Sequence, residues 1–316
     1  MTTSVFLTVD VEFAWRHYAA GYDVDTIYAR SIEPAGVGLS FQLAQLARHG
    51  LKACFFVDPM PALVFGIDPV RRMVETILAA GQEVQLHIHP NWRGADESDR
   101  ETRYGRFQLH EYGADEQRAL LVTATELLVA AGAPPPIAFR AGSYSANDDT
   151  LRALPDLGFV YDSSHNGGEA QVSRIQLEPT QIAPVMRELV EVPVTVIEEL
   201  PGRLRTFQLC ALSRHEAAAA LDHAMAEAHQ AVTIVSHGFE LANRAGTHAN
   251  AVHVRRFDAL CRRLAERAAA LPTRHFADRP VLALDANDRP LGPALWRRRA
   301  RQAEQAWSNW VSERRR

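Results

Sequence analysis

This chain of 316 residues contains a pair of histidines and a pair of carboxylates in which the two members are two residues apart. The pairs are His87 with His89, and Asp10 with Glu12. On a β-strand, residues i and i+2 point to the same face, so two imidazoles in this arrangement can share one cation. Two imidazoles and one carboxylate leave coordination positions open, which is typical of a catalytic divalent metal site. The second carboxylate can then accept a proton from water that the metal activates.

Alternating apolar runs predict the elements that position these side chains. Strands are expected at residues 5–10, 52–57, 83–89, 137–141, 159–162, 189–196 and 231–236. Helices are expected at residues 39–48, 69–80, 114–131, 148–154 and 214–230. Strands that alternate with helices predict a parallel sheet, and the continuous apolar runs 54–57 and 232–235 fit strands buried on both faces. We therefore expect a closed or nearly closed β/α barrel.

Chemically competent side chains follow one topological rule, because each lies at or just after the end of a predicted strand. They are Asp10, Glu12, His87, His89, Arg140, Asp162 and His237. In a β/α barrel the carboxyl ends of the strands meet at one face, and that face carries the active site. The sequence therefore predicts that these side chains converge.

Composition excludes several classes of function. The formal net charge is −4, which argues against a nucleic-acid-binding surface. The three cysteines are far apart, so neither a disulfide framework nor a thiolate zinc site is expected. No apolar run approaches the roughly 20 residues that span a bilayer. The N-terminal residues lack the features of a signal peptide, so a cytoplasmic protein is expected.

Two long connections and a basic C-terminal segment complete the chain. Residues 91–113 are expected to form a lid or substrate-contact loop, and residues 163–187 a second long loop that contributes to specificity. We expect a barrel domain at 1–284 and a C-terminal helical extension at 285–316 that carries Trp296, Trp307 and Trp310. A helix with solvated charges and buried tryptophans is the favoured interpretation. A partner-docking helix and peripheral contact with a membrane are the alternatives.

Five segments resemble, in order, the five motifs of the polysaccharide deacetylases, the NodB-homology or carbohydrate esterase family 4 group. They are residues 8–12 (Thr-Val-Asp-Val-Glu), 86–90 (Leu-His-Ile-His-Pro), 140–144 (Arg-Ala-Gly-Ser-Tyr), 161–164 (Tyr-Asp-Ser-Ser) and 235–237 (Val-Ser-His). The resemblance implies a distorted (β/α)7 barrel, here with a C-terminal basic helical tail. It also implies one divalent metal, with zinc favoured over cobalt, manganese or nickel.

The resemblance also assigns roles to the metal-site residues. Asp10 would be the general base. The family usually places its carboxylate ligand directly after the base, where this chain has Val11, so Glu12 would ligate the metal. His87 and His89 would complete the ligand set. The family commonly spaces its two histidines by four residues, and this chain has Asn91 at that position.

Four further residues would support the chemistry by the same resemblance. Arg140 would orient Asp10, and Asp162 would in turn hold Arg140. The backbone N–H of Tyr144 would stabilise the oxyanion. His237 would be the general acid that protonates the leaving amine, although Gly238 follows it where the family has proline.

The predicted function is hydrolysis of an N-acetyl group on a polysaccharide, an oligosaccharide, or a lipid-linked or nucleotide-linked sugar. An allantoinase-like hydrolase of another linear or cyclic amide is the nearest alternative. A non-catalytic glycan-binding barrel is a second alternative, and a two-carboxylate glycosidase without metal is a third.

Overall fold

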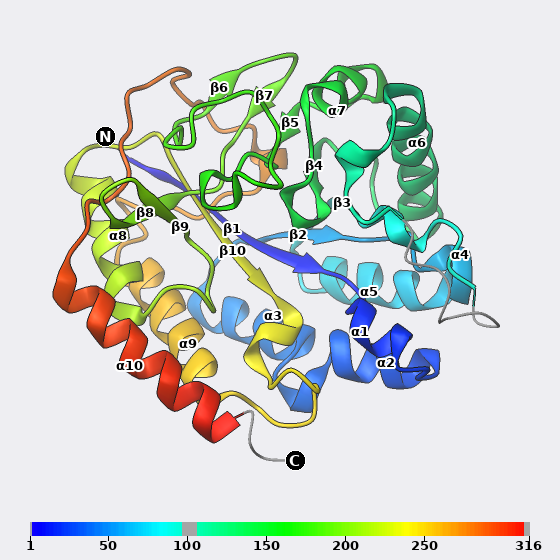
Figure 1. The fold of residues 1–316 in the computed structure, drawn as a ribbon, viewed down its shortest axis with the longest axis horizontal. Coiled ribbons are helices and arrows are strands. Elements are labelled where there is room, and N and C mark those ends of the chain that lie inside the picture. Colours follow the sequence, from blue (N-terminus) through cyan, green and yellow to red (C-terminus); the bar gives the residue numbers. More distant parts are fainter. Residues whose placement is uncertain (1, 97–105, 313–316) are drawn as a thin grey trace.

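The computed structural model describes residues 2–96 and 106–312 and contains a curled sheet of eight strands (Figure 1). The spatial order is β10-β1-β2-β3-β4-β5-β7-β6. All neighbouring pairs are parallel except β6 with β7. The strands are β1 (Ser4–Val11), β2 (Cys54–Val57), β3 (Glu83–Ile88), β4 (Ala138–Ala141), β5 (Tyr161–Asp162), β6 (Val185–Met186), β7 (Val190–Glu191) and β10 (Ala231–His237). Each predicted strand run overlaps one of the seven parallel strands.

The gap between β7 and β10 is bridged by the segment that follows β7. The N–H of Thr195 donates to the carbonyl of Thr233 over 3.2 Å, and the N–H of Val235 donates to the carbonyl of Phe207 over 3.0 Å. Between these contacts the chain makes a two-stranded hairpin of β8 (Val196–Leu200) and β9 (Arg203–Thr206), which the sequence patterns did not predict. The expected distorted barrel is confirmed, with an irregular seam in place of a regular last strand pair.

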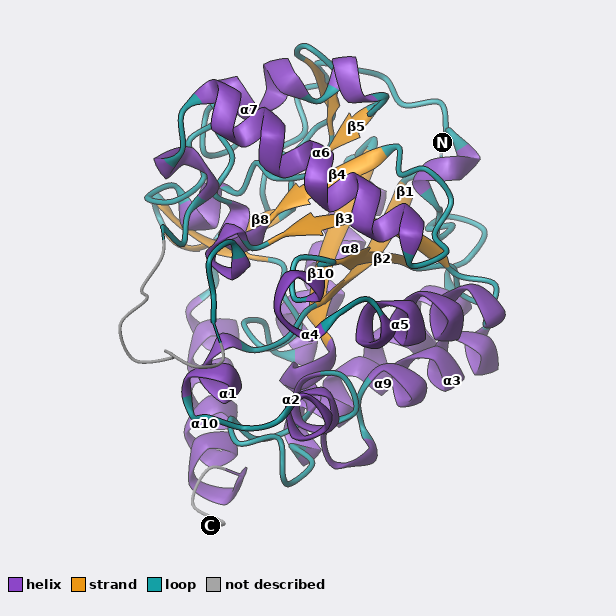
Figure 2. Ribbon diagram, turned by 90° about the vertical axis from the view of Figure 1, so that its right-hand side faces the viewer, coloured by secondary structure: helices purple, strands orange, loops and turns teal. Residues whose placement is uncertain are grey.

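Helices surround the sheet (Figure 2). They are α1 (Trp15–Ala19), α2 (Val24–Ser31), α3 (Leu39–His49), α4 (Ala62–Phe65), α5 (Asp68–Ala79), α6 (Ala114–Ala130), α7 (Asp148–Ala153), α8 (Arg214–Ala226), α9 (Ala251–Glu266) and α10 (Leu295–Ser312). The five predicted barrel helices are confirmed, although α8 ends at Ala226 rather than near residue 230. The short α1, α2 and α4 and the longer α9 were not predicted. In the part of the chain that the structure describes, no helix has the length and apolarity needed to cross a membrane.

Strand alternation separates two kinds of environment. Leu7 and Val9 of β1 belong to the large apolar cluster that packs the sheet against the helices. Phe6, which points the other way, belongs to a smaller cluster that also contains Phe56 and Phe276. The Phe6 and Phe276 rings stack with their centroids 4.5 Å apart and plug one end of the barrel. The next inward residues along β1 are Thr8 and Asp10, so the interior becomes polar toward the strand ends.

The C-terminal helix α10 is present, but it docks through polar contacts. Arg301 is buried and pairs with the buried carboxylates of Glu199, from β8, and Glu216, from α8. Glu199 also contacts Arg203, Arg205 and Arg298. The expectation of buried tryptophans is wrong, because the three indoles lie on the opposite, exposed side of α10. The division into a barrel at 1–284 and an extension at 285–316 stays a prediction.

Glu199→Ala is expected to lower the free energy of unfolding by about 3 kcal/mol, because it leaves buried arginine charge without its main partner. Urea unfolding followed by circular dichroism measures the change. The control is Glu198→Ala on the same strand, whose carboxylate accepts an exposed backbone N–H from Gly202. It should stay within about 0.5 kcal/mol of the parent. Equal effects of the two variants would contradict the role given to Glu199.

Candidate metal centre and catalytic site

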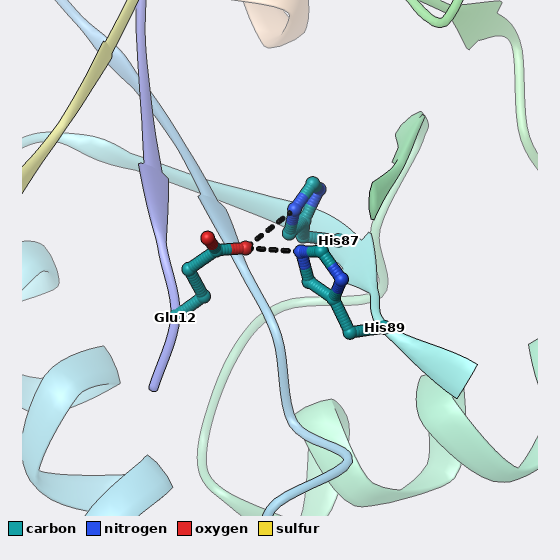
Figure 3. Close-up of side chains that lie close together, drawn as sticks. All are labelled: Glu12, His87 and His89. Carbon is teal, nitrogen blue, oxygen red and sulfur yellow. Dashed lines mark hydrogen bonds and ion pairs between the residues drawn. The ribbon is translucent and has the colours of Figure 1, made fainter. Parts of the chain in front are cut away.

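Glu12, His87 and His89 come together at the carboxyl ends of β1 and β3 (Figure 3). The Glu12 Oε2 atom lies 3.1 Å from the Nε2 of His87 and also contacts the Nε2 of His89. The three ligand atoms all lie within 4.8 Å of one another. The predicted pairing of the two histidines with a carboxylate from the first strand is therefore present in the structure.

The hydrogen bonding of His87 shows that this cluster fits a cation. Its Nδ1 lies 2.8 Å from the backbone carbonyl oxygen of Arg140, which can only accept, so the Nδ1–H must donate. In a neutral imidazole, Nε2 is then an unprotonated acceptor, and it faces the Glu12 carboxylate, which is also an acceptor. Two buried acceptors that face each other need a positive charge between them. A backbone carbonyl that fixes the tautomer is a common support for a metal-ligating histidine.

Protons on the imidazoles can supply this positive charge when no metal is bound. Burial alone would lower the pKa of His89, but the Glu12 carboxylate raises it to about 9. Burial alone would raise the pKa of Glu12, but the positive charge of His89 and hydrogen bonds from both imidazoles hold it well below its usual range. The site therefore favours an ionised Glu12 carboxylate beside a positively charged partner. A divalent metal would replace the shared protons.

Asp58 is a further acidic residue here that the sequence analysis missed. It follows β2 directly and is fully buried, and burial raises its pKa to about 6, against the opposing charge of His89 and His87. One carboxylate oxygen accepts from the N–H of Met60 over 3.0 Å. The other has no hydrogen-bond partner among the described residues. The strand-end rule applied to the other strands would have identified it.

Gly142 explains how the second histidine reaches this position. A Cβ added at Gly142 would lie 2.6 Å from Cε1 and Nδ1 of the His89 ring, and 2.7 Å from the carbonyl oxygen of Ile88. Only a glycine therefore lets the His89 ring pack over the turn after β4. The segment 140–144 therefore contributes both the charged side chain of Arg140 and, at Gly142, the space that the His89 ring occupies.

Asp10 is held by Arg140, as predicted. The Nη1 of Arg140 donates to Asp10 Oδ1 over 2.8 Å and to the hydroxyl of Thr8 over 2.7 Å. Its Nε and Nη2 donate to the carbonyl and the hydroxyl oxygen of Ser163, each over 3.0 Å. The guanidinium also lies over the Phe56 ring. All of these groups are buried, so Asp10 has one fixed orientation.

The predicted support of Arg140 by Asp162 needs correction. In residues 2–96 and 106–312, Ser163 and Thr8 hold the guanidinium instead. Asp162 accepts from the N–H and the hydroxyl of Ser164, and it shares a hydrogen bond with Glu191. The reason is register. Phe139 is aligned with Asp162, so the inward-pointing Arg140 is level with residue 163 and not with residue 162. Burial raises the pKa of Asp162, and burial beside Asp162 raises that of Glu191.

Tyr144 lies in a strained turn beside the same site. Ser143 and Tyr144 have φ angles of 53° and 60°, in the left-handed region that residues with a Cβ rarely adopt. Such strain concentrates at functional sites. The Tyr144 ring is buried against Val194 and Val235. The oxyanion role of its backbone N–H stays a prediction.

His237 and Glu240 form the far side of the site. The His237 Nε2 lies 3.7 Å from Asp10 Oδ2, and its Nδ1 lies 2.9 Å from Glu240 Oε1. Burial alone would lower the pKa of His237, but the charge and hydrogen bond of Glu240 raise it to about 9. Glu240 was not predicted, although it lies only three residues after His237, in the same turn. The thiol of Cys210 also donates to Glu240 over 3.3 Å.

Comparison with solved structures identifies this architecture. The "putative polysaccharide deacetylase" of Mycobacterium smegmatis superposes with a TM-score of 0.52 at 21% identity, over 87% of this chain and 93% of that chain. This chain has the polysaccharide deacetylase fold. The family 4 carbohydrate esterase of Streptomyces lividans gives a TM-score of 0.43 at 12% identity, over 92% and 98%. The wild-type BA3943 pseudoenzyme of Bacillus anthracis gives 0.42 at 15%, over 94% and 66%. No family model and no curated protein matches the sequence.

A cavity of about 370 Å³ opens over the metal-type cluster. Its walls include Glu12, His89 and Ser143 together with five aromatic residues: Phe13, Trp15, Trp92, Phe107 and Phe239. Trp92 and Phe107 come from the predicted lid at 91–113, of which residues 97–105 lie outside the described part of the chain. Among the described residues, the predicted loop at 163–187 gives none of the lining of this cavity, so it does not face this opening.

Gly142→Ala is expected to weaken metal affinity roughly 10–100-fold, as loss of an outer support does, because the new methyl group displaces the His89 ring. Competition with a chromophoric zinc chelator measures the affinity. Gly292→Ala is the matched control, since a Cβ at Gly292 would meet no atom within 4 Å. Unchanged affinity in the Gly142 variant would show that His89 is not a ligand.

Proposed function

We propose that this chain is a metal-dependent carbon–nitrogen hydrolase that removes N-acetyl groups from a saccharide. One observation carries the proposal. A carboxylate and two imidazoles able to hold a cation lie at the same end of the barrel as a buried aspartate fixed by arginine and a histidine paired with glutamate. A ligand set, a base and an acid at one barrel end are the components of hydrolysis with activated water.

Glu12, His87 and His89 would hold the metal, zinc in first place, because imidazole nitrogen and carboxylate oxygen suit that ion. When bound, the metal would supply a Lewis acid that polarises the acetyl carbonyl and lowers the pKa of water. Asp10 would accept a proton from that water through Oδ2, since Oδ1 is taken by Arg140. The Tyr144 N–H would donate to the developing oxyanion.

His237 would deliver the proton that the leaving nitrogen needs. Its Nε2 faces the site beside Asp10, while its Nδ1 is held by Glu240. A raised pKa keeps this imidazole protonated at neutral pH, as a general acid requires. In each reaction Asp10 would gain a proton and His237 would lose one, and transfer of a proton from Asp10 to His237 would restore both groups.

The cavity walls support a sugar as the substrate. Trp15, Phe107 and Phe239 present aromatic surface around the cluster, and such surface packs on the apolar faces of sugar rings while polar groups fix orientation. A lipid-linked or nucleotide-linked saccharide is the proposed class within this group. The cytoplasmic location stays a prediction.

Acetate release from N-acetylglucosamine oligomers, nucleotide-linked N-acetyl sugars and lipid-linked N-acetyl sugars tests the function, with small cyclic imides as the competing substrates. Asp10→Asn keeps the shape of the side chain but removes the base, so it should lower kcat roughly 10²–10⁴-fold. Asp25→Asn, at an exposed position in α2, is the control and should keep full activity.

Activity should also disappear with a chelator and return when zinc is added. Chelator-insensitive cleavage of glycosidic bonds would support a two-carboxylate glycosidase instead. Saccharide binding without turnover, unaffected by Asp10→Asn, would support a non-catalytic barrel.

Glu240→Gln is expected to move the alkaline limb of the pH–kcat profile to lower pH. His237 must be protonated to act as the acid, so activity falls as pH rises through its pKa, which is about 9 in the parent protein. Removing the Glu240 charge lowers that pKa, and the limb shifts with it. Glu266→Gln, at an exposed position in α9, should leave the profile unchanged. An alkaline limb that does not move would exclude Glu240 as the residue that positions and charges His237.

A further inference from the structure

Helix α10 has its polar and apolar faces in the reverse of the usual arrangement. The face that packs on the barrel is polar. It carries Arg301 against Glu199 and Glu216, Glu304 against Arg256, and Ser308 against Asn250. A surface helix normally buries its apolar stripe and exposes its charges.

The outward face of α10 carries the largest exposed aromatic side chains of the described residues. Trp296, Trp307 and Trp310 are 61%, 56% and 55% exposed, and Leu295 beside them is 60% exposed. Separations of eleven and three residues place all three indoles on one side of a helix with 3.6 residues per turn. The Trp307 and Trp310 rings lie 5.5 Å apart. Figure 1 shows α10 along the outer edge of the molecule, with α8 and α9 behind it.

This stripe is large enough to indicate a function. Three indoles of about 150–250 Å² each, a little more than half exposed, present on the order of 300–400 Å² of aromatic surface. Apolar patches of that size on a soluble protein usually mark an interaction site. Tryptophan is also the residue that prefers the boundary between hydrocarbon and water, because its ring is apolar and its N–H needs a polar partner.

The charge of the same segment specifies the partner. Helix α10, residues 295–312, contains four arginines and one glutamate, whereas the whole chain has a net charge of −4. Arg298 and Arg301 contact Glu199 on the inward face, whereas Arg299 is exposed on α10. Arg214, Arg255 and Arg262 line the adjoining surface groove of about 510 Å³, beside the acidic Asp258 and Glu304. A second copy of the chain in a two-fold interface would bring this face, with the same arginines, against itself. An anionic surface would neutralise them.

We propose that the outward face of α10 lies in the headgroup region of an anionic phospholipid bilayer. The indoles would enter the boundary between headgroups and acyl chains, and the arginines would contact lipid phosphates. The inward face of α10 borders a cavity of about 570 Å³, which Glu240 also lines. With a helix diameter of about 10 Å, the bilayer would lie one helix width from that cavity. This attachment is independent of the proposed reaction.

Vesicle flotation of the full chain tests the proposal. The protein should float with vesicles of phosphatidylcholine containing phosphatidylglycerol, and not with phosphatidylcholine alone. The combined variant Trp296→Ala, Trp307→Ala and Trp310→Ala should bind more than about tenfold more weakly, because binding scales with the buried apolar area. Arg299→Gln should weaken binding less, and added salt should weaken it in every variant.

Two controls separate this role from a general loss of apolar surface or of fold. Leu63→Ala with Met186→Ala removes two exposed apolar side chains from other elements and should bind as the parent does. The combined variant Trp296→Phe, Trp307→Phe and Trp310→Phe keeps apolar surface, so it should retain most of the binding. Circular dichroism checks that α10 persists.

Three results would overturn the proposal. The first is a parent protein that does not float with anionic vesicles at low salt. The second is a triple alanine variant that binds as well as the parent. The third is a parent protein that is dimeric by light scattering and becomes monomeric in the triple alanine variant without any vesicle binding, because a second copy would then cover this face.

Discussion

The buried guanidinium of Arg140 is the interaction on which the site depends. Its side chain fixes Asp10, and its backbone carbonyl fixes the tautomer of His87. One residue therefore orients both the proposed base and a proposed metal ligand. Burying a charge costs several kcal/mol unless partners compensate for the lost water. Here Asp10, Thr8 and Ser163 supply those partners, so the site is rigid before any substrate arrives.

The interior of the barrel has an apolar zone at one end and a polar zone at the other. Phe6 and Phe276 close one end with stacked rings, which excludes water from below. Above them the inward side chains of β1, β3 and β4 are Thr8, His87 and Arg140, all buried. Hydrogen bonds and ion pairs are stronger in this low-dielectric space than in water. The proposed acid and base can therefore affect each other strongly across the 3.7 Å between His237 and Asp10.

Sequence patterns predicted the parts of the site that depend on periodicity alone. The i, i+2 spacing predicted that Glu12, His87 and His89 would meet, and the strand-end rule predicted the shared face. The role of Asp162 depended on register between β4 and β5, and a difference of one residue gave that role to Ser163. Glu240 lies in a turn whose path no local pattern specifies. Its pairing with His237 was therefore outside the reach of the sequence.

Helix α10 shows the same limit for packing. Its periodicity predicted a helix, but which face docks depended on Glu199 and Glu216, acidic residues far away in the chain.

The central claim is that Glu12, His87 and His89 bind one metal, and anomalous diffraction from zinc-loaded crystals tests it most directly. A single peak about 2.0–2.2 Å from Glu12 Oε2 and from the Nε2 atoms of His87 and His89 is the predicted result. Zinc bound elsewhere, with the three side chains still paired to one another, would contradict the account.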